Sequence, residues 1–341
     1  MNKLRGSFQG QNNTYIDKVV RRVVKFLTTS LSVRSGYNFV KLLEYNNLPQ
    51  VKYLYYYLFS TLLKREYVAY LANNNFELAY KKKIRWAGLI LQYSDWKIEC
   101  AAAHDFLRIL SKNGYTKYQV SMEYSNVSFK EVDKISSEKF YLYGPNSQHP
   151  PNIKYKDCII VLTKDIENNI DKFKDSILFL NSIYYHEKIK NNSSKKNQLL
   201  QKYGKIYINS MHVINDKNIN YSIIPPGSEL CSPMALGRIL YNLVIENGRF
   251  KGVIEGYDMY LEEESYSKFY PTLARNNNEI DEKMIVRGIS NHDPLYNFLM
   301  VKELIQYVNL IDSDIFLKII KMSGNEYMER LIDVRKFELL N

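Results

Sequence analysis

His292 is the residue of this 341-residue chain whose type and position best suit general-base chemistry. It stands directly before Asp293-Pro294 and a helix predicted over 295–308. A histidine with an ordinary pKa accepts a proton at neutral pH, and helix starts commonly present catalytic side chains and phosphates. The run Asn291 to Pro294 is also good N-cap sequence, so a purely structural capping turn is the alternative.

A second candidate is the turn formed by Gly144, Pro145, Asn146 and Ser147, which follows a strand predicted at 139–143. Glycine is free in φ, proline fixes φ, and Asn and Ser favour turns. Such a turn at a strand end of an open α/β sheet presents backbone N–H groups to a nucleotide. The motif therefore predicts a nucleotide site, with a plain strand connection as the alternative.

Alternating strands and helices in the second part of the chain must position these residues. Runs rich in β-branched and aromatic residues predict strands. They occur at 139–143, 158–162, 177–180, 205–208 and 252–256. A helix is predicted at 233–246, and the alternation favours an α/β domain with a largely parallel sheet.

The first part of the chain differs in both periodicity and charge. Apolar residues at helical spacing predict an amphipathic helix over 14–31, with basic residues off the apolar stripe. Further helices are predicted at 36–46, 50–72, 76–94 and 97–113. Residues 1–130 hold 20 Lys+Arg against 8 Asp+Glu, whereas residues 131–341 hold 27 against 28. We therefore predict a basic all-helical domain at 1–130 and an α/β domain at 131–341.

Short motifs of the second part occur in an order that is known from one family. After the Gly144 turn they are Leu180-Asn181-Ser182-Ile183-Tyr184-Tyr185, Tyr207-Ile208-Asn209-Ser210, Cys231-Ser232-Pro233-Met234-Ala235-Leu236, Glu255-Gly256-Tyr257-Asp258-Met259-Tyr260, Glu264-Ser265-Tyr266 and His292-Asp293. With these motifs, roughly residues 138–310 resemble the bacterial CMP-sialic-acid-dependent sialyltransferases of Campylobacter type, which decorate lipooligosaccharide. The helical part lies outside the resemblance.

The resemblance implies a nucleotide-binding, parallel-sheet glycosyltransferase domain. It also implies inverting transfer of a CMP-activated keto sugar acid to a hydroxyl of a bacterial surface glycan, such as lipopolysaccharide or capsule. His292 would be the general base, and Tyr260 and Tyr266 would contact the leaving phosphate. Asn181 and Asn209 would hold the nucleotide and the donor sugar. Ser232 would match the serine of the family's Ser-Gly pair at a helix start.

Two departures from the family pattern leave the donor sugar open. The family's first turn is Gly-Asn-Gly-Pro-Ser, whereas here Tyr143 is followed by Gly-Pro-Asn-Ser. Pro233 replaces the glycine of the Ser-Gly pair and removes a backbone donor near the donor's carboxylate or phosphate. Both sialic acid and Kdo, another keto acid activated by CMP, are therefore expected donors.

No cofactor or metal is expected beside the CMP-activated co-substrate. Because CMP carries one phosphate, tyrosine hydroxyls can stabilise the leaving charge in place of a metal. The Asp312-Ser313-Asp314 run fits the Asp-x-Asp pattern of metal-dependent glycosyltransferases, yet it precedes an apolar helical run at 315–320 and fits helix capping. The cysteines form no CxxC pair, which argues against a structural zinc site and fits a reducing cytosol.

The expected partners are a CMP-sugar donor and a glycan or lipid-linked glycan acceptor, with a homo-oligomer as a family-level expectation. No signal peptide or spanning segment is predicted, so the expected place is the cytoplasm or the inner face of the cell membrane. Residues 1–130 suit binding to an anionic membrane surface. The alternative function is a basic helical protein that binds nucleic acid or membranes without catalysis. Nucleic acid is not expected, because the remainder of the chain is neutral.

Overall fold

The computed structural model describes two compact units of the chain. The described residues are 49–73, 75–94, 97–117, 134–144, 157–163, 175–181, 185–209, 220–221, 230–261 and 292–340. The helical unit holds residues 49–117 of this set together with Leu230 and Cys231, and the α/β unit holds the sheet. The helices predicted at 14–31 and 36–46 lie outside the described residues.

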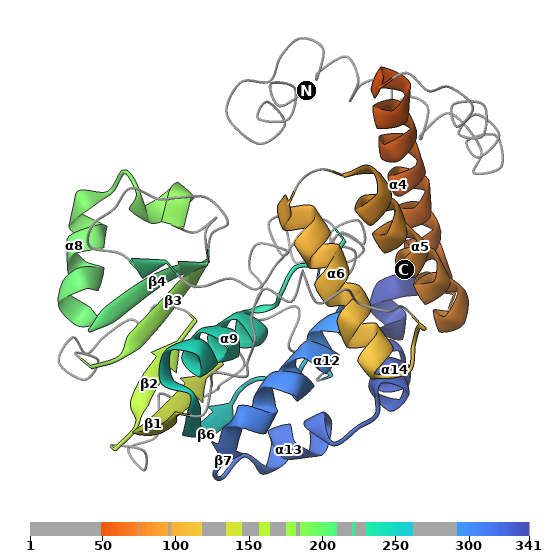
Figure 1. Ribbon diagram of the computed structural model, residues 1–341. Coiled ribbons are helices and arrows are strands. Elements are labelled where there is room, and N and C mark those ends of the chain that lie inside the picture. The colour runs from red at the N-terminus through yellow and green to blue at the C-terminus, as the bar shows by residue number, and fades with distance from the viewer. Residues whose placement is uncertain are drawn as a thin grey trace. The chain divides into compact units, whose positions relative to one another are not determined.

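Three helices make up the described part of the helical unit (Figure 1). They are α4 (Pro49–Ala72), α5 (Phe76–Tyr93) and α6 (Lys97–Lys112). Each lies within one residue of its predicted bounds, because polar or Asn-rich breaks separate strong helical periodicities. Leu63, Tyr67, Ala87 and Phe106 are completely buried among these helices.

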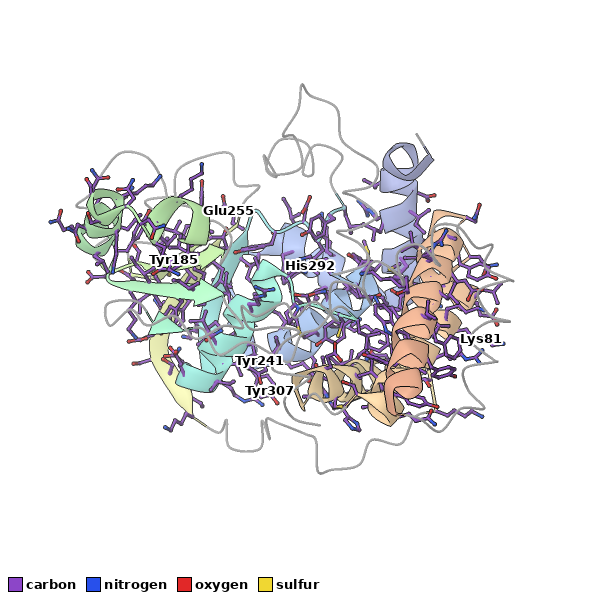
Figure 2. The ribbon with its side chains drawn as sticks, turned by 90° about the horizontal axis from the view of Figure 1, so that it is seen from above. Lys81, Tyr185, Tyr241, Glu255, His292 and Tyr307 are labelled. Atoms are coloured by element: carbon purple, nitrogen blue, oxygen red, sulfur yellow. The ribbon has the colours of Figure 1, made fainter. Side chains whose placement is uncertain are left out.

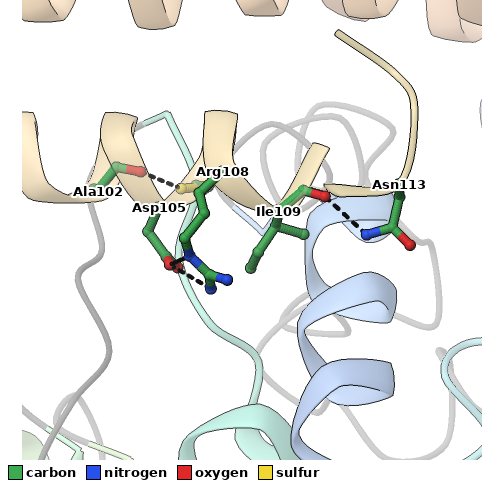
Figure 3. Close-up of polar contacts among 6 residues, drawn as sticks. Ala102, Asp105, Arg108, Ile109 and Asn113 are labelled. Carbon is green, nitrogen blue, oxygen red and sulfur yellow. Dashed lines mark hydrogen bonds and ion pairs between the residues drawn. The ribbon is translucent and has the colours of Figure 1, made fainter. Parts of the chain in front are cut away.

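Carboxylates neutralise two basic side chains of the helical unit. The Lys82 ammonium lies 3.0 Å from the Glu66 carboxylate, which joins α5 to α4. The Arg108 guanidinium lies 2.8 Å from Asp105 one turn earlier in α6 (Figure 3). These pairs are partly exposed, so each contributes at most about 1 kcal/mol to stability.

Lys83 of α5 is completely buried and lies against aromatic rings. Its ammonium lies 4.2 Å from the ring centroid of Tyr67 and 5.8 Å from that of Phe106. The negative face of an aromatic ring attracts a cation most strongly where water is excluded. The interior of the helical unit therefore accommodates this cation through its own side chains.

The α/β unit is built on a seven-stranded sheet with the strand order β5-β4-β3-β2-β1-β6-β7 (Figure 1). The strands are β1 (Ile135–Tyr143), β2 (Ile159–Leu162), β3 (Ile177–Asn181), β4 (Lys205–Asn209), β5 (Asn220–Tyr221), β6 (Arg249–Glu255) and β7 (Val308–Leu310). All six neighbouring pairs are parallel. The predicted α/β class with a parallel sheet is therefore confirmed.

Helices lie on both faces of this sheet. On one face, η5 (Tyr185–Ile189) and α8 (Ser193–Lys202) pack with Tyr141, Leu178 and Ile206 in a buried cluster. On the other face, the Tyr207 hydroxyl donates to the Glu246 carboxylate of α9 (Ala235–Asn247) at 3.0 Å. Because successive strand residues point to opposite faces, α9 lies opposite α8. Burial on both faces explains why the central strands consist of nearly continuous apolar residues.

The remaining elements follow the sheet's second half. They are α12 (Pro294–Leu304), η6 (Ile305–Tyr307), α13 (Asp314–Ile320) and α14 (Gly324–Leu340). The predicted helix over 295–308 is wrong at its C-terminal end, because α12 stops at Leu304 and Val308 opens β7. Backbone pairing of β7 with β6 outweighs the local helical pattern there.

Strands β1 and β6 both begin earlier than the sequence predicts. Their first residues are Ile135 and Arg249, and Ile135 pairs with Arg249 in register. Polar residues occupy the early part of β1, so its sequence does not resemble a buried strand.

Among the described helices, none has the length and apolar character that a membrane crossing requires.

Candidate functional site

The carboxyl edge of the sheet is the position at which the topology favours ligand binding. β1 lies between β2 and β6, so the strand order reverses at the β1–β6 pair. In open parallel sheets, ligands bind beyond the carboxyl ends of the strands at such a reversal. Helices α9 and α12 precede β6 and β7, and a helix that connects parallel strands runs antiparallel to them. The N-termini of α9 and α12 therefore lie at this same edge.

Figure 2 shows two labelled residues of this edge, Glu255 at the end of β6 and His292 just before α12. Tyr307, which precedes β7, marks the opposite edge of the sheet in the same view.

Gly144 allows the ends of β1 and β6 to approach each other closely. Its N–H donates to the Glu255 carbonyl at 2.7 Å. A Cβ at this position would lie 2.3 Å from the Gly256 carbonyl oxygen and 2.7 Å from the Tyr257 ring. Because real Cβ contacts are longer, only glycine fits between these strand ends.

The segment after β6 has an unusual backbone. Met259 has a φ of 51° and Tyr260 a φ of 66°, a region that L-residues rarely occupy. The Asp258 carboxylate accepts the Tyr260 N–H at 3.0 Å, and the Tyr327 hydroxyl donates to the Met259 carbonyl at 3.0 Å. Two consecutive residues of this kind persist only where neighbours hold them, and such positions concentrate at functional sites.

Asn297 ties the start of α12 to the segment that enters α9. Its amide nitrogen donates to the Ser232 carbonyl at 3.1 Å and to the Asp293 carbonyl at 2.8 Å. Its amide oxygen accepts the Met234 N–H at 2.6 Å. Asn297 is completely buried, so these three hydrogen bonds fix the geometry of both helix starts.

His292 binds the same segment. Its Nδ1 lies 3.0 Å from the Ser232 carbonyl oxygen. A carbonyl only accepts hydrogen bonds, so the neutral imidazole carries its proton on Nδ1 and its lone pair on Nε2. The next residue, Asp293, caps α12 by accepting the Tyr296 N–H at 2.7 Å, and Pro294 follows at the first helical position. The capping turn at Asp293 and the His292 tautomer with a basic Nε2 are therefore both present, and one does not replace the other.

Arg238 lies one turn into α9. Its Nε donates to the Pro233 carbonyl at 2.7 Å, and one Nη donates to the Ser232 hydroxyl at 3.0 Å. Burial lowers the pKa of Arg238 to about 10, and the nearby Tyr260 is the titratable group that interacts with its charge. The arginine therefore stays cationic at neutral pH.

Four of the predicted site residues, His292, Ser232, Tyr260 and Gly144, belong to this neighbourhood. His292 contacts Ser232 directly, and Tyr260 interacts with Arg238, which binds Ser232. Gly144 lies at the end of β1, at the same edge of the sheet. The predicted residues Pro145, Asn146, Ser147 and Tyr266 lie outside the described residues.

Asn181 and Asn209 end neighbouring strands and stand opposite each other in register. Strands lie about 4.8 Å apart, so β3 is roughly 10 Å and β4 roughly 14 Å from β1. The two asparagines thus share the carboxyl edge with His292 but occupy a separate stretch of it.

Sequence reasoning missed Arg238 and Asn297. Both had a signal, because each is a polar residue inside an otherwise apolar helix: ALGRILYNLV for Arg238 and PLYNFLMV for Asn297. A buried polar residue needs a hydrogen-bonding reason to be there. That reason is tertiary here, since both residues bind the segment from Ser232 to Met234.

Asp312 and Asp314 belong to the start of α13. Ser313 is its N-cap, and the Ser313 hydroxyl accepts the Ile254 N–H at 3.0 Å and donates to the Ile311 carbonyl at 2.8 Å. Asp314 lies in the first turn, where the helix dipole favours a negative charge. In the part of the chain that the structure describes, no group of three or more His, Cys, Asp or Glu residues is arranged to hold a metal ion.

Comparisons of this chain with protein-family models, with curated proteins and with solved structures give no match.

Proposed function

We propose that the α/β unit is a metal-independent, inverting glycosyltransferase that uses a CMP-activated keto sugar acid, either sialic acid or Kdo. The acceptor is a hydroxyl of a bacterial surface glycan or of its lipid-linked form. The observation that supports this most is His292 in its basic tautomer at the N-terminal end of α12, at the carboxyl edge of a parallel sheet. This is where a nucleotide donor would meet a base.

His292 would act on the acceptor in one proton transfer. The acceptor hydroxyl gives its proton to Nε2 while its oxygen attacks the anomeric carbon of the donor. The bond from that carbon to the CMP phosphate breaks at the same centre, which inverts its configuration. The Ser232 carbonyl keeps accepting the Nδ1–H, so the imidazolium that forms retains a hydrogen bond.

The leaving phosphate gains negative charge as CMP departs. Hydroxyl donors that are aimed at its oxygens stabilise this charge without a metal, and each can contribute about 3 kcal/mol to the transition state. Tyr260 is held for such a role by its unusual backbone, and Tyr266 would be its companion. Gly144 to Ser147, Asn181 and Asn209 would hold the nucleotide and the sugar along the strand ends.

CMP release tests this proposal directly. The purified full chain is incubated with CMP-sialic acid, and separately with CMP-Kdo, in EDTA. We expect metal-independent release of CMP from one donor and a loss of roughly 100-fold or more in the rate for His292→Ala.

The matched control is His104→Gln, which changes a buried histidine of α6 and should leave the rate unchanged. No release from either donor, together with no thermal shift by CMP, would refute the proposal.

A second candidate function belongs to the helical unit. On α5, Lys81 and Arg85 lie one turn apart and are exposed, and Arg65 of α4 is exposed as well. Residues i and i+4 share one helix face, so the first two form a basic stripe that suits an anionic membrane surface.

Sedimentation with vesicles that contain phosphatidylserine tests this at low salt. We expect binding that weakens in Lys81→Glu/Arg85→Glu, whereas equal binding by that variant would contradict the membrane role. Retention of the chain by RNA instead of vesicles would favour the nucleic-acid alternative.

A further inference from the structure

Arg238 is a half-buried cation, and the bonds that hold its side chain include no carboxylate within the described part of the chain. By contrast, ion pairs join Lys82 to Glu66 and Arg108 to Asp105 in the helical unit. The protein groups that Arg238 contacts are a carbonyl and a hydroxyl, which orient the guanidinium but carry no negative charge. A cation that is partly withdrawn from water gains from a negative partner, so such a residue points to an anion supplied by a ligand.

The first turn of α9 adds a second source of positive potential. Met234 is the N-cap, and its side chain makes no capping hydrogen bond. The first intrahelical bond of the ladder is from the Arg238 N–H to the Met234 carbonyl, so the N–H groups of residues 235–237 precede it. The helix also contains no acidic residue in its first turn. No side chain of that turn therefore offsets the positive end of the helix dipole.

We propose that Arg238 and the first turn of α9 form an oxyanion site for a carboxylate or phosphate of the ligand. The planar guanidinium has five N–H donors, and the bonds to Pro233 and Ser232 use two of them. The remaining donors form a fork that matches two oxygens of one anion.

The site is held rigidly before any ligand arrives. Asn297 fixes the segment from Ser232 to Met234, and that segment in turn fixes the guanidinium. Little conformational freedom remains to be lost when an anion binds. Arg238 thus acts as a binding residue, while Asn297 acts on the anion through the segment that it positions.

This inference deepens the proposed function and rests on it for the identity of the anion. A CMP-activated keto acid carries two anionic groups, the phosphate and the sugar carboxylate. Both are oxyanions with the geometry that a guanidinium recognises. A transferase of this kind would discriminate against donors that lack the group at Arg238.

Calorimetric titration with separate fragments identifies the anion. The probes are CMP, cytidine, and free N-acetylneuraminate and Kdo, each titrated into the full chain and into Arg238→Met and Arg238→Lys. We expect roughly 10- to 100-fold weaker binding of one anionic fragment by Arg238→Met, with partial recovery in Arg238→Lys. Weaker CMP binding assigns the phosphate, and weaker binding of a keto acid assigns the carboxylate.

The matched control is Arg249→Met. Arg249 is exposed at the start of β6, where its guanidinium lies 5.3 Å from the Tyr307 ring centroid. We expect this variant to bind every fragment as the wild type does. Equal affinity of wild type and Arg238→Met for all anionic fragments would overturn the inference, as would an absence of binding by the wild type.

A labelling measurement covers the case in which Arg238→Met does not fold. Phenylglyoxal modifies arginine guanidinium groups, and peptide mass spectrometry then reports labelling at Arg238 and Arg249 in the wild type. CMP or a keto acid should protect Arg238 and leave Arg249 unprotected. Equal labelling of Arg238 with and without every fragment would overturn the inference.

The two proposals fail in different ways. CMP release by a chain whose anion affinity does not depend on Arg238 would remove the inference and leave the transferase. Arg238-dependent anion binding with no CMP release from either donor would remove the transferase and leave the oxyanion site.

Discussion

The helical unit and the carboxyl edge of the sheet treat their polar side chains in opposite ways. In the helical unit, Lys82 and Arg108 pair with carboxylates, and Lys83 lies on aromatic rings. At the carboxyl edge, Arg238 and His292 bind backbone carbonyls, which orient them without neutralising charge. The first arrangement compensates charge locally, whereas the second orients a guanidinium and an imidazole through backbone carbonyls at the edge where parallel sheets bind ligands.

Substitution of glycine by alanine should show the largest difference between the two regions. At Gly144 the new Cβ would lie 2.3 Å from a backbone oxygen, so we expect Gly144→Ala to destabilise the chain by about 3 kcal/mol. At Gly88, which is exposed within α5, nothing lies within 4 Å, and we expect Gly88→Ala to stabilise by about 0.5–1 kcal/mol.

Urea unfolding monitored by circular dichroism measures both variants. Destabilisation by Gly144→Ala together with stabilisation by Gly88→Ala would support a tight backbone approach between the ends of β1 and β6. A neutral Gly144→Ala would show that these strand ends separate easily.

Asparagine provides the next comparison. Asn297→Ala removes three hydrogen bonds of a completely buried side chain at the two helix starts, and we expect a loss of roughly 2–3 kcal/mol in the free energy of unfolding. Asn113→Ala removes one hydrogen bond from an exposed side chain to the Ile109 carbonyl after α6 (Figure 3) and should cost less than about 1 kcal/mol. Chemical denaturation of the two variants side by side measures both losses. Equal losses would mean that Asn297 contributes no more to stability than an asparagine at a helix end.

Tyrosine–carboxylate hydrogen bonds occur in both regions, and the stability lost on removing them should differ less between the regions than for glycine or asparagine. The completely buried Tyr141 donates to the Glu255 carboxylate at 2.5 Å, and we expect Tyr141→Phe to cost about 1.5–2 kcal/mol. Tyr56 donates to Glu99 at 3.0 Å, but Ser94 donates to the same oxygen at 2.8 Å, so Tyr56→Phe should cost about 0.5–1 kcal/mol. A larger loss for Tyr56→Phe in thermal unfolding would reverse this ranking.

The pH dependence of stability gives the smallest expected effect. Burial lowers the pKa of His104 in the helical unit, so the unfolded chain binds this proton more readily than the folded chain does. The free energy of unfolding should therefore fall as the pH drops through the unfolded-state pKa of about 6.5, by less than about 1.4 kcal/mol per pH unit.

His104→Gln should remove this part of the dependence between pH 7 and pH 5, as followed by denaturation at each pH. If the free energy of unfolding changes with pH equally in wild type and His104→Gln, this histidine is not the cause of the pH dependence.

Local pattern was sufficient for the helical unit because each helix is marked by its own periodicity and ended by its own breaks. The bounds of α4, α5 and α6 follow from residues that are neighbours in the sequence. The same reasoning placed the cores of β1 to β4 and β6. It missed β5, β7 and the early residues of β1, because those segments become strands through pairing with distant partners.

The site shows the same division between local and tertiary information. The sequence by itself determined that His292 precedes a capped helix and that Gly144 ends a strand, since both depend on adjacent residues. Only the tertiary structure decided that His292, Asn297 and Arg238 converge on the segment from Ser232 to Met234, from positions up to 65 residues away. Hydrogen bonds between distant segments are specified by how the helices pack on the sheet, and no local spacing in the sequence encodes that packing.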